Sequence, residues 1–577
     1  MLETILLWSV IIVIAYLCGY SILNIFFCKG LKTEKSSIMS ADMCILSGFA
    51  ALTVYVQFFS LFYKVGFICF MLMLLIVGSL FILSFILNSN YYEHSPFKYV
   101  KAVILDTFSP IKRLNMVKLI LSIIIIFFAC LWTSLPQNYY DTWFYHSQAI
   151  RWFEEYGVIK GLGNLHCRFA YNSSFMGLQA LFGFRFLRYP SYHVVNGIIS
   201  VVFALFALLS NKLFDIFTVD AFKDLKGFVR NHSFSVSDFT KLSIFYWIFR
   251  NAKYMSSCQT DDLAMLLIMY IISKWLETSD SNLGDNSKLC IYCILSVFGV
   301  WALTVKLSAA TTVLLAIYPA ALLIKNRKIR EIVGSLISGI VVVLPWLIRN
   351  IIISGWLIYP FPTIDLFDVE WKMPAELAVN DNAFIREYAR NNWRGEESSA
   401  KASIFMLIGF ISLLVSLIIT ISQLIKKNRI QESTALIVVY IGIAYWLFSA
   451  PAIRFGEPYL SICILYASYK LLSNIFGRLL LAICTIELII CFALFLIGGF
   501  GNERLKETLI HQFPYSTPPC RSMQWEGMTI YYPEEGYEII GYGNFPAFNY
   551  SDYFWDGTIT DAELMGDNLK DGVRWKD

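Results

Sequence analysis

The apolar runs of this sequence constrain its fold more than any other feature. Fourteen stretches approach the roughly 17–25 residues that a helix needs to cross the hydrocarbon core of a membrane. They lie at 5–28, 41–63, 65–88, 116–136, 191–211, 241–256, 261–277, 288–305, 307–324, 331–351, 402–424, 433–450, 457–474 and 479–500. Charged residues make up 15% of the chain, against about 25% in a typical soluble domain. The sequence therefore predicts an all-α polytopic membrane protein with about fourteen transmembrane helices.

Basic residues predict how these spans are oriented. Lys and Arg gather in alternate connections between the spans: Lys29, Lys32, Lys35, Lys98, Lys101, Lys112, Arg113, Lys212, Lys223, Lys226, Arg230, 325–330, 426–429 and Arg478. Short loops rich in Lys and Arg stay on the cytoplasmic side of a membrane. Both termini are therefore expected outside.

The same pattern divides the chain into three parts. Residues 1–115 form a three-helix N-terminal segment, and residues 116–500 form the main transmembrane core. The core is interrupted by polar outer loops at 137–190 and 352–401. The tail, 501–577, is rich in Gly and aromatic residues, which favours a small β-containing cap on the outer face over a sugar-stacking module.

The first large outer loop opens with a carboxylate among aromatic residues. The segment "DTWFYHSQAIRWFEEY" (141–156) has helical spacing and aromatic side chains suited to a membrane interface. Asp141 stands at its start, where a carboxylate can cap free backbone N–H groups. Its neighbours Tyr139, Tyr140 and Trp143 and its place beside a span also suit a proton acceptor. The two interpretations are compatible.

The next turn, "YGVIKGLGNLHCRFAYNSS", combines glycines with side chains that recognise sugars or phosphates. Arg presents a planar fork that suits a phosphate group. We expect this loop to supply the substrate-binding residues Tyr145, His146, Asn164, His166, Arg168 and Asn172. His166 fits a hydrogen-bonding loop residue better than a metal ligand, and a divalent cation is left open as a cofactor.

Further charged residues lie at the outer membrane boundary. Asp261 and Asp262 begin one apolar run, and two adjacent carboxylates exceed what a helix cap needs. They are expected to cap the helix or to hold substrate or a divalent ion. Lys306, Arg349 and Arg454 are cations on the side where the orientation rule disfavours them. We therefore expect these three to bind an anionic ligand; the alternatives are independent surface roles and, for Lys306, snorkelling of its side chain to the interface.

Two resemblances follow from these residues. The layout, with Asp141 in "YYDTWFYH" and "TDD" at 260–262, resembles the C-type (GT-C) membrane glycosyltransferases. Most of the chain is also similar to an uncharacterised family of bacterial polytopic membrane proteins. That similarity rests on the segment 141–174, "SCQTDD", "WLIRNIIISGWLIYPFPTIDLFDVEWKMP", "APAIRF" and "YGNFPAF".

The GT-C resemblance implies a membrane-embedded glycosyltransferase of the bacterial inner membrane, acting in cell-envelope polysaccharide or glycolipid assembly. Its donor would be a polyprenyl-phosphate-linked sugar, its acceptor a glycan or lipid, and its general base Asp141. Two other functions are considered: transport or flipping of a lipid-linked or anionic substrate, and a non-catalytic envelope scaffold. Nucleic acid is not an expected partner.

Overall fold

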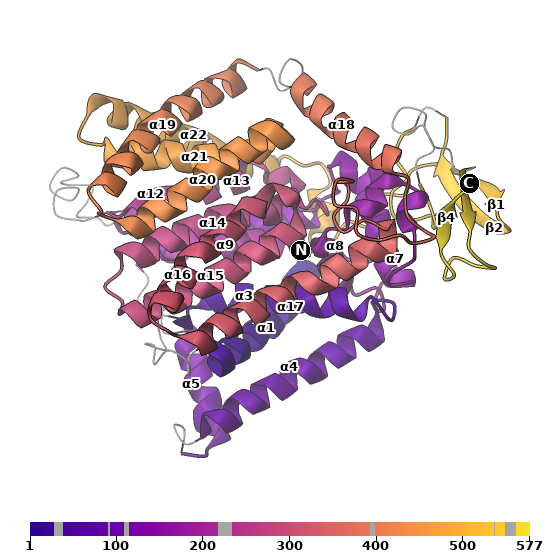
Figure 1. Ribbon diagram of the computed structural model, residues 1–577, viewed down its shortest axis with the longest axis horizontal. Coiled ribbons are helices and arrows are strands. Elements are labelled where there is room, and N and C mark those ends of the chain that lie inside the picture. The colour runs from indigo at the N-terminus through magenta and orange to yellow at the C-terminus, as the bar shows by residue number, and fades with distance from the viewer. Residues whose placement is uncertain are drawn as a thin grey trace.

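The structure is a computed structural model that describes residues 1–27, 38–89, 93–108, 115–216, 234–392, 399–535, 537–548 and 561–576. Eight cations of the predicted cytoplasmic loops lie outside the described residues: Lys29, Lys32, Lys35, Lys112, Arg113, Lys223, Lys226 and Arg230. The described chain is a bundle of helices with a small β-containing tail at one end (Figure 1).

Ten helices within the described residues are long and apolar enough to cross a membrane. They are α1 (Leu2–Ile22) with η1 (Leu23–Phe27), α3 (Ala41–Phe59), α4 (Phe67–Leu87), α6 (Met116–Ser134), α15 (Asp285–Val305), η9 (Leu307–Ala316) with α16 (Ile317–Lys325), α17 (Ile329–Ser354), α19 (Ala400–Ile425), α20 (Ile430–Ser449) and α22 (Ile475–Phe500). Each corresponds to one predicted span. The polytopic all-α class is therefore confirmed.

The other four predicted spans are helices of a different character. α9 (Val195–Leu209) and α13 (Leu242–Arg250) are short. α14 (Asp261–Asp280) and α21 (Ile453–Lys470) are long enough but carry charged residues. Because these four do not read as membrane spans by length and composition, the count of fourteen stays a prediction.

Shorter elements complete the chain. The helical ones are α5 (Pro96–Phe108), η4 (Thr142–His146), α7 (Ser147–Glu155), η5 (Leu162–Asn164), η6 (Cys167–Tyr171), α8 (Ser174–Leu181), η7 (Lys212–Ile216), α12 (Val236–Thr240), η8 (Ala252–Tyr254), α18 (Ala375–Asn392) and α23 (Leu505–Thr508). In the tail, β1 (Cys520–Trp525) pairs antiparallel with β2 (Met528–Pro533), and β3 (Ala562–Leu564) with β4 (Val573–Trp575). The expected β-containing cap is therefore present.

Helix α14 forms the axis of the bundle. From Leu263 to Ile272 no side chain is more than 1% exposed, because α9, α15, α20 and α21 pack around it. Protein therefore surrounds this apolar middle of α14, and Asp261, Asp262 and Lys274 toward its two ends are buried as well. Charges inside a membrane protein are tolerated when they face such an interior and find partners there.

Close backbone contact joins α1 and α3. A Cβ atom added at Gly19 would lie 1.8 Å from the carbonyl oxygen of Cys44, and one at Gly48 would lie 1.8 Å from that of Ala15. Small residues at such crossings let membrane helices approach each other and gain van der Waals contact. This pair fixes the N-terminal helices against the core.

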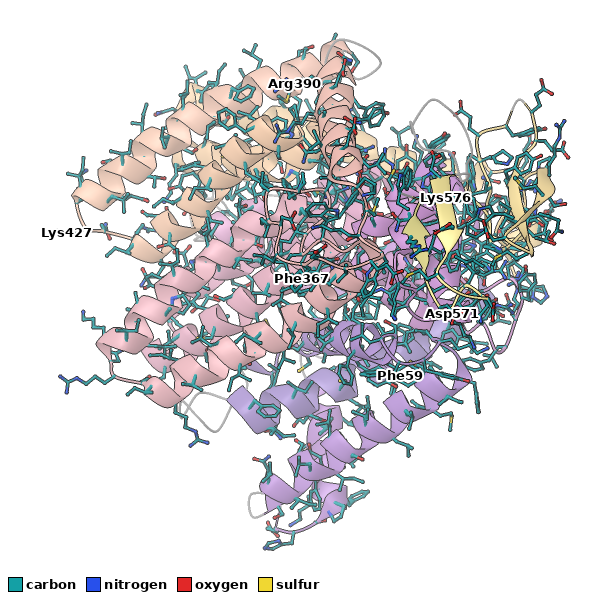
Figure 2. The ribbon with its side chains drawn as sticks, turned by 45° about the vertical axis from the view of Figure 1, so that its right-hand side comes forward. Phe59, Phe367, Arg390, Lys427, Asp571 and Lys576 are labelled. Carbon is teal, nitrogen blue, oxygen red and sulfur yellow. The ribbon has the colours of Figure 1, made fainter. Side chains whose placement is uncertain are left out.

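The two ends of the bundle differ in charge and in the segments they carry. The cation-rich connections 325–330 and 426–429 lie at one end, where Figure 2 shows Lys427 far from Asp571 and Lys576 of the tail. Both termini belong to the other end, where the Met1 amino group donates a 2.5 Å hydrogen bond to the Thr508 carbonyl. The separation agrees with the predicted arrangement of loops.

Candidate functional site

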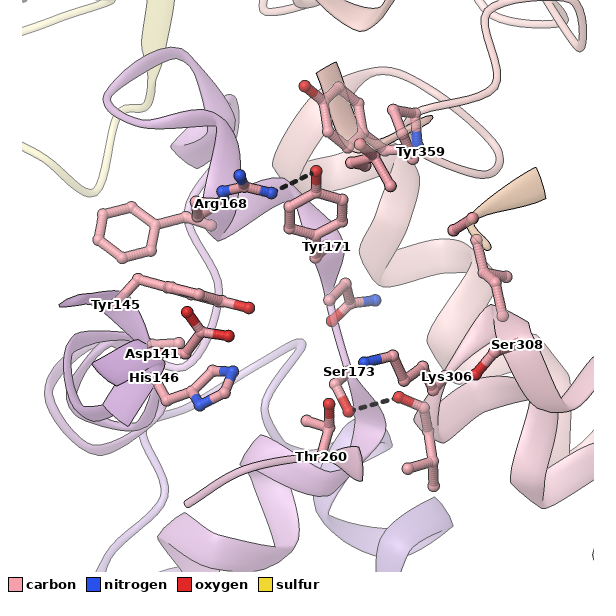
Figure 3. A pocket seen from close by; sticks show the side chains of 18 of the residues that line it. Asp141, Tyr145, His146, Arg168, Tyr171, Ser173, Thr260, Lys306, Ser308 and Tyr359 are labelled. Atoms are coloured by element: carbon pink, nitrogen blue, oxygen red, sulfur yellow. Dashed lines mark hydrogen bonds between the residues drawn. The ribbon is translucent and has the colours of Figure 1, made fainter. Parts of the chain in front are cut away.

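A cavity of about 480 Å³ opens at the end of the bundle that carries the termini. Its walls come from the first outer loop, α17, the start of η9, α18 and the turn between α20 and α21. Figure 3 shows its polar side chains converging from several of these elements. A volume of about 300–1,000 Å³ is typical of small-molecule sites, so the cavity can hold a ligand of that size.

Asp141 lines this cavity, and its carboxylate has no partner among the residues that the structure describes. It precedes η4, a π-helical turn of a kind that is frequent at functional sites. Its side chain caps no backbone N–H group, and it forms no hydrogen bond or ion pair with any described residue. In Figure 3 the carboxylate lies between Tyr145 and His146. The expected capping role of the Asp141 side chain is therefore wrong.

Tyr145 and His146 flank Asp141 in the cavity wall. Their ring centroids lie 4.3 Å apart, and His146 is only 3% exposed. Burial lowers the pKa of the His146 imidazole to about 4, so the ring is neutral at pH 7. Its Nδ1 atom has no hydrogen-bond partner among the described residues. A neutral imidazole next to a free carboxylate suits the binding of a hydroxyl-bearing ligand.

Two cations share one carboxylate on the opposite wall. Lys306, between α15 and η9, forms an ion pair with Oδ1 of Asp261. The Arg454 Nε atom lies 3.5 Å from Oδ2 of the same Asp261. Both cations also lie over the ring of Phe455, with Lys306 Nζ at 4.2 Å and Arg454 Cζ at 4.9 Å from its centroid. Lys306, Arg454 and Phe455 line the cavity, whereas Asp261 lies behind them.

The neighbouring Asp262 serves the fold. Its Oδ1 atom accepts a 2.9 Å hydrogen bond from Trp247 Nε1, and Oδ2 accepts a 2.6 Å bond from Gln259 Nε2. Asp262 is 3% exposed and does not line the cavity. The two adjacent carboxylates therefore have separate environments, one among cations and one among neutral donors.

Arg168 connects the first outer loop to α18. Its guanidinium donates a 2.8 Å hydrogen bond to the Tyr171 oxygen and lies 3.8 Å from Oδ1 of Asp381. The Tyr171 hydroxyl donates a 2.5 Å bond to Asp381. Sequence reasoning missed Tyr171 and Asp381. The available signal was the spacing of Leu377, Asp381 and Phe384, which places them on one face of a helix.

Asn172 and Arg349 line the cavity while their side chains hold α17 in place. Asn172 Nδ2 donates to the Trp346 carbonyl at 3.1 Å and to Asn350 Oδ1 at 2.7 Å. The Arg349 guanidinium donates to Ser60 Oγ at 2.9 Å and to the Gly157 carbonyl at 2.8 Å. Arg349 is 2% exposed, so its fork is already engaged by protein.

The sequence model of a family described as "Domain of unknown function (DUF8201)" matches residues 1–461. The chain belongs to this family. Every residue that lines the cavity lies within the DUF8201 region, whereas the tail lies beyond it. Comparison with curated proteins and with solved structures gives no match.

Besides Asp261 and Asp262, two expected binding residues of the first outer loop lie outside the cavity. Asn164 Nδ2 donates to the Trp371 carbonyl at 3.0 Å and to the Val573 carbonyl at 3.2 Å, which ties the loop to the tail. His166 Nδ1 accepts a 3.2 Å hydrogen bond from the Arg168 N–H. Burial lowers the pKa of His166 to about 3, so this ring is neutral too. Both side chains shape the loop.

The tail packs against the DUF8201 region through α7. Glu154 is buried and accepts a 2.5 Å hydrogen bond from the Tyr542 hydroxyl and a 2.6 Å bond from Ser191 Oγ. Burial raises the pKa of this carboxyl to about 7. Gln148 Nε2 donates to the Gly541 carbonyl at 2.9 Å. No described residue of the tail lines the cavity, so the tail supports the loop from behind.

The described residues also bear on a metal cofactor. No group of three or more His, Cys, Asp and Glu side chains comes together among them in a way that could hold a metal ion. The charged side chains that line the cavity are Asp141 and the cations Arg168, Lys306, Arg349, Arg386 and Arg454.

Proposed function

We propose that the chain is a membrane-embedded glycosyltransferase of the GT-C type that uses a polyprenyl-phosphate-linked sugar. The proposal places it in the bacterial inner membrane, with the cavity on the outer face. One observation carries it: the Asp141 carboxylate has no partner among the described residues and shares a ligand-sized cavity with five cations, of which Lys306 and Arg454 form one wall. An unpaired base and a cationic wall are what transfer of a sugar from a phosphate requires.

Asp141 acts as the general base in this proposal. It takes the proton of an acceptor hydroxyl while the hydroxyl oxygen bonds to the anomeric carbon of the donor sugar. The bond between that carbon and the phosphate oxygen breaks, and its electron pair leaves with the lipid phosphate. Proton transfer by a positioned side chain contributes about 10²–10⁴-fold to such a rate.

Lys306 and Arg454 stabilise the departing phosphate. Negative charge grows on the leaving oxygen, and fixed cations in a water-poor site stabilise it more than mobile water does. Their side chains are 25% and 41% exposed, so a ligand can reach them. Arg349 also lines the cavity but contributes only its positive potential, because its guanidinium N–H groups already donate to Ser60 and Gly157.

The remaining lining residues position the sugar and the acceptor. Tyr145 and His146 lie beside the base, and Arg168 and Asn172 lie on the adjoining wall. Trp346 of α17 and Trp446 of α20 also line the cavity, so the cavity borders two helices long enough to span a membrane. A lipid-linked donor suits this position because its tail stays among membrane lipids while its head enters the cavity.

The test compares lipid-linked intermediates and envelope glycans in cells with the wild type, Asp141→Asn or no copy. We expect Asp141→Asn to match the deletion, to accumulate the lipid-linked sugar and to reach normal membrane levels. Asp285→Asn is the matched control, because Asp285 is exposed at the other end of the bundle. Full glycan transfer by Asp141→Asn would end the proposal.

Transport of a lipid-linked or anionic substrate is a second candidate. It is favoured by a partly buried charged network of Asp42, Lys274 and Glu277 at the end of α14 opposite the cavity, because transporters use such residues. The apolar middle of α14 separates this network from the cavity. Loss of substrate translocation in Lys274→Met, at normal protein level and with glycan transfer intact in Asp141→Asn, would favour transport.

A further inference from the structure

The mouth of the cavity carries two exposed tyrosines to which the proposed mechanism gives no role. Tyr140 immediately precedes Asp141 in the first outer loop, and Tyr388 lies on α18. Both residues line the cavity, and they are 43% and 52% exposed. Aromatic side chains are common in the walls of ligand sites, where they supply large and rigid contact surfaces. The two tyrosines are therefore candidates for a contact with substrate.

A second aromatic ring lies behind each tyrosine. The ring centroids of Tyr140 and Phe144 lie 5.5 Å apart with the planes at 20°, and those of Phe384 and Tyr388 lie 5.9 Å apart with the planes at 24°. In each pair the two residues are four positions apart, so helical spacing brings them together. Stacking holds each tyrosine ring in place and leaves part of it accessible.

The two aromatic pairs approach each other although they belong to distant parts of the chain. Burial raises the pKa of the Tyr140 hydroxyl, and the carboxylates of Glu538 and Asp141 and the hydroxyl of Tyr388 raise it further. Tyr388 has this effect because it lies within electrostatic range of Tyr140. The first outer loop and α18 therefore present one tyrosine each to the same opening.

The surroundings of both tyrosines are charged and exposed. The Tyr140 hydroxyl donates a 2.8 Å hydrogen bond to Glu538, an exposed residue of the tail. Arg386 and Glu387, which precede Tyr388 on α18, are exposed as well. The mouth therefore opens to water, where an aliphatic chain would remain hydrated at a cost in free energy. A ligand that is partly polar suits this position better.

A sugar ring has the two surfaces that such a mouth can bind. One face of a pyranose is formed by C–H groups, which pack against the electron-rich face of an aromatic ring. Its hydroxyl groups point outward and can donate hydrogen bonds to a carboxylate such as that of Glu538. Because Asp141 follows Tyr140 in the chain, a ring held at Tyr140 brings its hydroxyl groups close to the proposed base.

We propose that Tyr140 and Tyr388 form a clamp for a sugar ring of the acceptor, so that the acceptor is a saccharide rather than an aliphatic lipid alcohol. That the bound saccharide is the acceptor rests on the proposed function. The binding of a saccharide at the mouth does not, because it requires only the two aromatic pairs. Lys306 and Arg454 remain the separate wall for the phosphate of the donor.

Saccharide binding to the purified full-length chain tests the inference without any transfer reaction. The chain is held in lipid nanodiscs, so that no sugar-bearing detergent competes, and cellotetraose, chitotetraose and maltotetraose are titrated by saturation-transfer NMR. We expect at least one tetrasaccharide to bind. Tyr388→Ala should weaken its binding about three- to tenfold, the range expected for loss of one aromatic contact. Tyr388→Trp and Tyr140→Phe keep a ring and should bind nearly as the wild type does.

Two controls separate the mouth from other surfaces. Tyr537 of the tail is 50% exposed but does not line the cavity, so Tyr537→Ala should bind the tetrasaccharide as the wild type does. Farnesyl phosphate is the probe for the donor wall. Lys306→Gln should weaken binding of farnesyl phosphate and leave the tetrasaccharide unaffected, whereas Tyr388→Ala should do the reverse. Thermal unfolding shows whether each variant is folded.

Several outcomes would overturn the inference. Failure of all three tetrasaccharides to bind would do so, and so would wild-type affinity in a folded Tyr388→Ala. If Tyr388→Ala does not fold, Tyr140→Leu replaces it and must weaken binding. Equal weakening of farnesyl phosphate and tetrasaccharide by Tyr388→Ala would reassign the mouth to lipid.

The inference and the proposed function fail separately. Normal glycan transfer by Asp141→Asn would remove the transferase and the acceptor assignment, and binding that depends on Tyr388 would still mark a saccharide site. Loss of transfer in Asp141→Asn without any binding of the tetrasaccharides would keep the transferase and remove the clamp.

Discussion

The two ends of α14 carry charged clusters of opposite character. At the end away from the cavity, Lys274 Nζ lies 3.1 Å from Asp42 and 3.6 Å from Glu277, and Lys241 Nζ lies 3.3 Å from Glu277. The side chains of Lys241 and Lys274 are 1% and 10% exposed. At the cavity end the cations around Asp261 remain partly open, and Asp141 has no partner among the described residues.

This difference distinguishes charged residues that stabilise the helix bundle from charged residues that are accessible to a ligand. Removing a charge from water is expensive and is repaid only by close, well-paired partners. The network around Lys274 meets that condition within the protein. At the cavity end the charged side chains remain accessible, as is expected of a site where a ligand supplies the remaining partner.

The largest effect is expected at Asp141, and the contrast between the two ends fails if Asp141 proves to be a structural residue. We expect Asp141→Asn to lower the rate of sugar transfer by about 10²–10⁴-fold with little change in thermal unfolding, because only a proton acceptor is lost. Asp42→Asn at the other end should do the reverse, with lower stability and normal activity of the folded protein. Transfer assays and thermal unfolding of both purified variants measure this, and equal effects would contradict the comparison.

The second largest effect is expected on stability. Lys274→Met removes the cation that pairs with the largely buried Asp42, while Glu277 keeps Lys241, and breaking such a pair costs up to about 3–5 kcal/mol of the free energy of unfolding. Denaturant or thermal unfolding measures the loss. Lys306→Met is the matched control and should lose clearly less, because Arg454 stays beside Asp261 and the Lys306 side chain is already 25% exposed. Similar losses in both variants would remove the distinction between closed and open clusters.

Glu154 extends the comparison to a buried carboxyl whose hydrogen bonds come from hydroxyl groups, those of Tyr542 and Ser191. Burial raises its pKa from the ordinary value of 4.5 to about 7. The folded state therefore holds the proton more tightly, and this contribution to tail docking is complete below pH 4.5 and lost as the pH rises through about 7. The hydrogen-exchange protection factors of residues 540–548, which correct for the intrinsic exchange rate at each pH, should fall from pH 5 to pH 8. Glu154→Gln should remove that dependence, and a wild-type profile in this variant would refute the assignment.

The smallest effect is expected at α18. Asp381→Asn removes the ion pair with Arg168 but keeps a hydrogen-bond acceptor for Tyr171, so about 1 kcal/mol of local stability should be lost. Faster hydrogen exchange of α18 measures it. The exposed Asp365, paired with Lys372, is the control, and Asp365→Asn should change little.

The sequence predicted the parts of the fold that face lipid and was less informative about the interior. Hydropathy found the ten long apolar helices, and it grouped α14 and α21 with them as spans although both carry charges. α14 can do so because neighbouring helices surround it, and α13 can be nine residues long because it packs inside the bundle. These surroundings are tertiary contacts, which a hydropathy window does not contain.

The candidate site was predicted where residues lie close together along the chain. Asp141, Tyr145 and His146 come from one short segment and line one wall. The contact between Arg168 and Asp381 spans 213 positions, and no local pattern pairs them. Separating Asp261 from Asp262 also required the fold, because adjacent residues on a helix point in different directions.

The 3₁₀ helix η9 has a consequence for where Lys306 lies in depth. A 3₁₀ helix rises about 2.0 Å per residue and an α-helix about 1.5 Å. The span Leu307–Lys325 has 19 residues, ten of them in η9. It therefore extends about 33 Å, where an α-helix of the same length would extend about 28 Å. A bilayer core is about 30 Å thick, so the stretched geometry lets a short segment reach across and keeps the Lys306 ammonium at the water boundary instead of below it.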